Sequence, residues 1–137
     1  MTYKFDATAR YAESHDWARV EGDVVVCGIS DYAQHALSDV VFIELPSVGK
    51  RVTKGEVYST VESVKAAEQV YAPVSGEIIA VNDDLEANPE LINDDPYGAG
   101  WMARVRAGNW ADDRAVLVNA AAYRQHIVKI EPEACFV

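Results

Sequence analysis

Positive charge is scarce in this chain. Lys and Arg together number 12 against 22 Asp and Glu, so the formal net charge is −10, and the few cations form no cluster. Phosphate backbones and anionic lipid surfaces attract clustered Lys and Arg, and they repel a protein of this charge. The longest apolar runs, such as residues 24–27 and 40–43, are far shorter than the roughly 20 residues that span a bilayer. We therefore expect no nucleic-acid partner and no membrane-spanning segment.

Cysteine is rarer still. Only Cys27 and Cys135 occur, far apart and outside any CxxC motif, which is too few for the disulfide framework of a small secreted domain. Residues 1–17 lack the apolar stretch of a secretory signal and carry acids that an organellar transit peptide avoids. These absences predict a reducing compartment, namely the cytoplasm for a bacterial-type protein, or the mitochondrial matrix if the source is eukaryotic.

The residues that are present predict one ordinary globular domain. With 137 residues, 50% of them hydrophobic, the chain can bury a real core and is too short for two typical domains. We therefore expect a single domain over residues 1–137, with its core at 11–127, a tail at 128–137, and a monomeric state.

Hydrophobic patterning predicts mainly strands. Two β-branched runs, 24–29 and 40–45, read as buried strands, and Ser30 between them is placed to cap a short helix. Alternating segments between glycines predict strands at 57–61, 69–72 and 77–81, and a further strand is expected at 101–105. The stretch 82–100 reads as an irregular loop with one helical turn near Pro89, and 112–127 has helical spacing. The expected fold is mainly β with short helices, a flattened β-barrel or sandwich with a lysine-bearing hairpin and a C-terminal helix.

Lys65 lies between the strands expected at 57–61 and 69–72, at the tip of a hairpin. Its neighbours there are small, so its amine is accessible to a modifying enzyme, and a rigid turn can carry a long acyl arm outward. From spacing alone, an ordinary solvated turn lysine remains the alternative.

The segment around Lys65 closely resembles the H-protein family of the glycine cleavage system, whose members are lipoyl carriers. The resemblance rests on VESVKAA at residues 61–67, followed by YAPVSGE at 71–77 and VN at 81–82. It extends to SHDW at 14–17, GISDYAQ at 28–34, LPSVG at 45–49, LIN at 91–93, PY at 96–97 and GW at 100–101. It covers about residues 11–123, and so long an ordered series is specific.

This resemblance implies a barrel-sandwich hybrid of two small sheets, with lipoate amide-linked to Lys65. The protein would be a carrier that serves as a substrate of other enzymes. It would take the aminomethyl group of glycine from a pyridoxal-phosphate decarboxylase (P protein) to a tetrahydrofolate-dependent aminomethyltransferase (T protein). Dihydrolipoyl dehydrogenase (L protein) would reoxidise it, and a lipoate ligase or lipoyl/octanoyl transferase would attach the arm. A lipoyl donor or relay protein is the alternative role.

The resemblance also suggests roles for residues around the arm, with no catalytic residue and no metal ligand among them. The residues that would be recognised by the ligase or partners are Glu62, Ser63, Val64, Ala66 and Glu68. Those that would hold the loaded arm are Ser14 and Asp16, as acceptors for an ammonium, and Trp17, as a wall of the cleft. Two positions depart from the family pattern: Ser38 replaces a common glycine, and Gln69 stands where an acid is frequent.

Other carrier classes fit the hairpin less well. Biotinyl domains normally have methionine on both sides of the lysine, where this chain has Val64 and Ala66. Lipoyl domains of 2-oxoacid dehydrogenases usually have Asp before the lysine. An unmodified interaction module also remains open.

Overall fold

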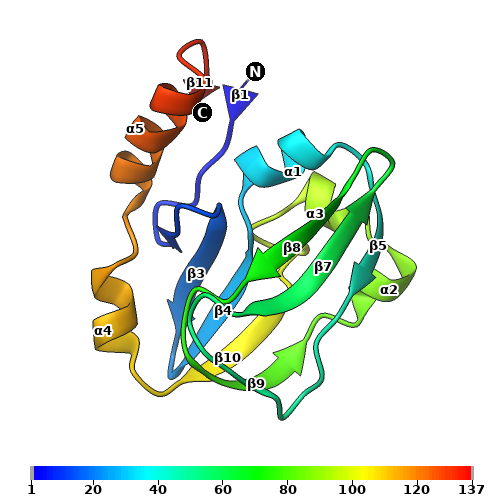
Figure 1. Cartoon of the computed structure of the whole chain (residues 1–137), viewed down its shortest axis with the longest axis vertical. Coiled ribbons are helices and arrows are strands. Elements are labelled where there is room, and N and C mark those ends of the chain that lie inside the picture. Colours follow the sequence, from blue (N-terminus) through cyan, green and yellow to red (C-terminus); the bar gives the residue numbers. More distant parts are fainter. Residues whose placement is uncertain (1, 137) are drawn as a thin grey trace.

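The computed structural model describes residues 2–136 and is mainly β, with short helices (Figure 1). The strands are β1 Thr2–Tyr3, β2 Arg10–Tyr11, β3 Asp16–Glu21, β4 Val24–Ile29, β5 Val40–Glu44, β6 Arg51–Val52, β7 Val57–Ser63, β8 Ala67–Tyr71, β9 Gly76–Val81, β10 Ala103–Ala107 and β11 Cys135–Phe136. The helices are α1 Asp31–Leu37, α2 Asp84–Ala87, α3 Leu91–Asp94, α4 Trp110–Ala115 and α5 Ala120–Ile130. No helix within the described range is long and apolar enough to cross a bilayer.

Two sheets enclose the main core. One has the strand order β2-β3-β4-β10-β9-β6, and the other has the order β5-β7-β8. Buried side chains from both sheets, including Val25 and Ile78 from the first and Ile43 and Val61 from the second, belong to one apolar cluster. The sheets do not close into a barrel, and this confirms the expected flattened sandwich of mainly β structure.

The strand and helix at 24–37 form where the sequence predicts them. The β-branched run of β4 lies in the middle of its sheet and pairs with β3 on one side and β10 on the other. Ser30 then caps α1, because its hydroxyl accepts a hydrogen bond from the Ala33 amide. The chain therefore turns sharply from the sheet into the helix that will form one wall of the site.

The predicted helix at 112–127 is wrong in its middle. The segment forms two helices, α4 and α5, separated by residues 116–119. Val118 instead exchanges backbone hydrogen bonds with Tyr11, which requires extended backbone, and Asn119 caps α5 through the Ala122 amide at 2.9 Å. The loop at 82–100 similarly contains two short helices, α2 and α3, and the strand expected at 101–105 runs over Ala103–Ala107.

The two ends of the chain lie side by side. Strand β1 pairs in parallel with β11, and α5 runs along the N-terminal segment (Figure 1). Tyr3 is buried in a second, aromatic cluster, so packed residues also lie outside the expected 11–127 core. The tail, for which the sequence predicts no element, continues α5 to Ile130 and then forms β11.

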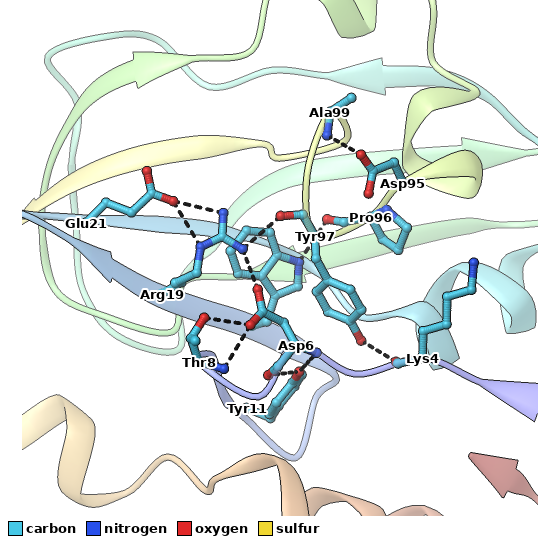
Figure 2. Close-up of polar contacts among 11 residues, drawn as sticks. Lys4, Asp6, Thr8, Tyr11, Arg19, Glu21, Asp95, Pro96, Tyr97 and Ala99 are labelled. Atoms are coloured by element: carbon cyan, nitrogen blue, oxygen red, sulfur yellow. Dashed lines mark hydrogen bonds and ion pairs between the residues drawn. The ribbon is translucent and has the colours of Figure 1, made fainter. Parts of the chain in front are cut away.

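The N-terminal segment is fastened to the main sheet by polar contacts (Figure 2). Asp6 accepts hydrogen bonds from Thr8 and forms an ion pair with Arg19 at 2.7 Å, while Arg19 also donates to the Tyr97 carbonyl. Partial burial opposes ionisation of Asp6, but the bonds from Thr8 and Arg19 outweigh it and hold the Asp6 pKa below its usual value. The ion pair between Asp6 and Arg19 therefore attaches the N-terminal segment to β3.

Candidate functional site

The tip of the β7–β8 hairpin is held by the Ser63 hydroxyl and by backbone hydrogen bonds. Ser63 Oγ accepts hydrogen bonds from the backbone amides of Lys65 and Ala66, at 3.2 and 3.0 Å. The Ser63 amide donates to the Ala66 carbonyl at 2.7 Å, and the Val64 amide donates to the Asp39 carbonyl just before β5. Residues 64 and 65 are thus presented on an ordered turn, and the Lys65 side chain is exposed.

The Lys65 ammonium reaches across to helix α1. Its Nζ donates a hydrogen bond of 2.8 Å to the Ala36 carbonyl in the last turn of that helix. Carbonyls at the C-terminal end of a helix lack an intrahelical partner and carry partial negative charge, so a cation is favourable there. The hairpin tip and α1 form the two sides of a cleft.

This cleft has a volume of about 220 Å³ and runs from the hairpin to the turn that precedes β3. Its walls come from that turn, from the end of β4, from α1 and from the hairpin with β8. The lining residues are Ser14, His15, Asp16, Ile29, Tyr32, Ala33, Ala36, Leu37, Lys65, Ala66, Glu68, Gln69 and Val70. The structure therefore brings Lys65 into one cleft with Ser14 and Asp16, although they lie far apart along the chain.

A buried carboxylate lies at the far end of the cleft. Asp16 is only 2% exposed, and its Oδ2 accepts a 2.5 Å hydrogen bond from the Ser14 hydroxyl. Burial raises the pKa of Asp16 to about 7, although hydrogen bonds from Ser14 and from the Tyr71 backbone act in the opposite direction. No cation forms an ion pair with Asp16 within the described residues. The site can therefore accept a positively charged guest.

Trp17 does not form a wall of this cleft, and that prediction is wrong. The indole is fully buried, and its Nε1 donates to the Pro96 carbonyl at 3.1 Å. It packs on Gly28 of the neighbouring strand, where a Cβ would lie only 2.9 Å from Nε1. Alternation along β3 places Trp17 on the side of the sheet opposite Asp16. Its contribution is to support the strand behind the site.

The residues predicted to face a ligase or partner fall into two groups. Ala66 and Glu68 line the cleft, whereas Glu62 and Val64 are exposed at the hairpin without lining it. Ser63 organises the turn through its hydroxyl. The side chains in both groups lie on either side of Lys65, where a protein that acts on its amine must approach.

The two departures from the family pattern have different structural outcomes. Gln69 and Glu68 both line the cleft, so one carboxylate is retained on this wall. Ser38 adopts a φ of 69° at the end of α1, a conformation that favours glycine. The turn forms nevertheless, because the Ser38 amide donates to the Gln34 carbonyl and Asn93 donates to the Ser38 carbonyl.

The sequence does not predict a set of residues behind the turn that carries Ser14 and Asp16. The Tyr123 hydroxyl lies 2.7 Å from His15 Nδ1 and 2.7 Å from Ser30 Oγ. In the sequence, His15 belongs to no metal-ligand spacing, and Tyr123 only continues an apolar helix face. No local pattern relates the two, because they are 108 residues apart.

Comparisons with known proteins agree with this geometry. A sequence model described as "Glycine cleavage H-protein" matches residues 9–130. The chain belongs to the glycine cleavage H-protein family. The "Probable glycine cleavage system H protein" of Natronomonas pharaonis is 50% identical over 127 residues, which cover 93% of this chain and 99% of that protein. The glycine cleavage system H protein of Thermus thermophilus is 52% identical over 115 residues, 84% of this chain and 89% of that protein.

A solved structure supports the same assignment. The crystal structure of a glycine cleavage system H protein from Mycobacterium marinum has a TM-score of 0.79 and 35% identity, and the match covers 90% of this chain and 98% of that one. H proteins are carriers rather than enzymes, so this chain has a carrier role in the glycine cleavage system. Membership of the system implies partner enzymes of that system.

Proposed function

We propose that Lys65 carries lipoate through an amide bond and that the chain shuttles the aminomethyl group of glycine between the enzymes of the system. The observation that carries this proposal is an exposed lysine that opens into a cleft ending in a buried carboxylate without a cationic partner among the described residues. When bound, lipoate supplies a disulfide that accepts the aminomethyl group and is afterwards restored by oxidation.

The residues of the cleft fit such an arm. Ile29, Ala33, Leu37 and Val70 give it apolar walls suited to an aliphatic chain, and its polar end lies at Ser14 and Asp16. This distribution matches a long apolar arm with a charged end better than it matches a uniformly polar ligand.

Ser14 and Asp16 would accept hydrogen bonds from the ammonium of the aminomethyl cargo. A hydrogen bond to a charged group contributes about 1.5–3 kcal/mol, and the low exposure of Asp16 places this bond out of bulk water. An ammonium beside Asp16 would also lower its pKa again and keep the carboxylate ionised. The role of these two residues is therefore to hold the cargo between partners.

The proposed partners are the decarboxylase, which loads the arm, the aminomethyltransferase, which unloads it, and dihydrolipoyl dehydrogenase, which reoxidises it. A lipoate ligase or lipoyl/octanoyl transferase would modify Lys65. Exposed acids beside the hairpin, Glu62 and Glu68, would steer these encounters.

Both cysteines are free thiols, in agreement with a reducing location such as the cytoplasm.

The test is Lys65→Arg. Arginine keeps the charge but offers no comparable primary amine for acylation, so we expect a folded protein that gains no lipoyl mass and supports no glycine-dependent CO2 exchange. Intact mass and peptide mapping would follow the modification, with Lys54→Arg as the matched control that remains fully lipoylated. Lipoate on another lysine, biotin on Lys65, or no modification of the wild-type protein would refute the assignment.

A further inference from the structure

We infer that the Tyr123 hydroxyl is a positioning group, which holds the turn bearing Ser14 and Asp16 in the geometry needed at the end of the cleft. The inference rests on the proposed role of these two residues in holding the cargo. Among the described residues Tyr123 forms no hydrogen bond with either of them, and it acts through His15, which stands between them in the chain.

Tyr123 joins three parts of the fold through one oxygen. Its hydroxyl lies 2.7 Å from His15 Nδ1 in the turn and 2.7 Å from Ser30 Oγ at the start of α1. The same Ser30 oxygen accepts a hydrogen bond from the Ala33 amide and so caps α1, and Ala33 lines the cleft. The tyrosine ring is fully buried and stacks on Tyr11 at 4.4 Å with an interplanar angle of 2°, so the hydroxyl has little freedom to move. The Tyr123 hydroxyl on α5 thus holds two walls of the cleft in place, the turn at His15 and the start of α1.

His15 needs this support because of its backbone. Its φ is 71°, in the left-handed region that residues other than glycine seldom occupy. The backbone is held by bonds from its amide to the Ala12 carbonyl at 3.0 Å and from the Ser30 amide to its carbonyl at 2.9 Å. The imidazole contact with Tyr123 fixes the side chain as well. Since the left-handed turn at His15 sets the directions of both neighbours, loosening it would separate the Ser14 hydroxyl from the Asp16 carboxylate.

The imidazole is also held in a form that does not compete with the cargo. Burial lowers the pKa of His15 to about 4, and the nearby His126, with ring centroids 5.7 Å apart, contributes to the same shift. A neutral ring places no positive charge beside Asp16 at neutral pH. The chain therefore uses a residue at the cleft that shapes the turn without neutralising the carboxylate.

Tyr123→Phe is the test, because it removes the hydroxyl and keeps the stacked ring. Tyr11→Phe is the matched control, since the Tyr11 hydroxyl bonds to the backbone of Asp6 on the N-terminal segment. The first measurement uses the unlipoylated chain: carbon NMR titration of the Asp16 carboxyl and exchange of the Ser30 amide. In Tyr123→Phe we expect the Asp16 pKa to fall by at least about one unit, because burial is the largest cause of its raised pKa and entry of water outweighs loss of the Ser14 hydrogen bond. Exchange of the Ser30 amide should accelerate at least about tenfold. Tyr11→Phe should change neither.

The second measurement uses protein that has been lipoylated and loaded with glycine by the decarboxylase, and it follows ammonia release without the aminomethyltransferase. Tyr123→Phe should release ammonia at least about threefold faster than wild type, whereas in an Asp16→Asn background it should add nothing. A merely structural role would give additive effects instead. If Asp16→Asn accelerates release but Tyr123→Phe leaves release and the Asp16 titration unchanged, the positioning role is refuted and the cargo site stands. If Asp16→Asn has no effect on release, the proposed cargo site fails, and the titration alone decides whether Tyr123 positions the turn.

Discussion

Replacing Asp16 by asparagine should make this protein more stable at alkaline pH while making it a poorer carrier. The Asp16 carboxyl is 2% exposed and has no cationic partner among the described residues, so its ionised form is costly in the folded state. Asparagine is nearly isosteric, can still accept the Ser14 hydrogen bond and bears no charge. The substitution therefore removes the desolvation penalty without opening a cavity.

The size of the effect follows from the two pKa values. The folded-state pKa is about 7 and the ordinary value is 3.8, so the folded state binds the proton more tightly. The contribution of the Asp16 carboxyl to the free energy of unfolding is fully present below pH 3.8, decreases as pH rises, and is lost as pH passes through 7. At about 1.4 kcal/mol for each tenfold difference, the full contribution is about 4 kcal/mol, of which about 2–3 kcal/mol is lost between roughly pH 5 and pH 8.

The assay is urea unfolding of wild type and Asp16→Asn at several pH values from about 5 to 8. The free energy of unfolding of the variant, relative to wild type, should rise by about 2–3 kcal/mol across this range. Asp6→Asn is a control whose difference from wild type should not change between about pH 5 and pH 8, because the pKa of Asp6 is lowered from 3.8 and its contribution is lost only in more acidic solution. A difference between Asp16→Asn and wild type that does not change with pH would refute the reasoning. Faster ammonia release from the same, more stable variant would show that the carboxylate is kept for its cargo.

Three further substitutions test other parts of the molecule. Glu62→Gln should slow lipoylation at low salt and matter less at high salt, because salt screens charges beyond about 8–10 Å, and an effect equal at both would indicate a direct contact instead. Ser38→Gly should raise the free energy of unfolding by about 1 kcal/mol, since φ is 69° there; a loss of stability in urea unfolding would contradict this. Gly28→Ala should cost about 1–3 kcal/mol by the same assay, because the added methyl would meet the Trp17 indole, and a neutral result would mean that the ring can shift.

Local signals account for the elements that the sequence predicts correctly. The run at β4 and the cap at Ser30 need only neighbouring residues to be recognised. Strand β3 escapes prediction because DWARVE has no clear alternation, and it is a strand because it pairs with β4 along its whole length. The break between α4 and α5 is also non-local, since Val118 bonds to Tyr11 across the fold.

In the candidate site, too, some residues are indicated by local sequence and others depend on contacts between distant parts of the chain. The position of Lys65 at a hairpin tip follows from two strands that are adjacent in sequence, whereas its role, like those of Ser14 and Asp16, is indicated by the family resemblance. The predicted placement of Trp17 is wrong because a motif gives residue order without giving the face of the strand. The link from Tyr123 to His15 depends on where α5 packs, and a periodic apolar face does not specify that.

The hydrogen bond from Lys65 to Ala36 has a consequence for modification itself. In the unmodified chain the Lys65 ammonium donates to the Ala36 carbonyl in the last turn of α1, and Lys65 and Ala36 both line the cleft. Acylation leaves an amide nitrogen with one hydrogen and no charge, so this attraction is lost. The proposed acylation of Lys65 would therefore remove a charge-assisted contact between the hairpin tip and α1.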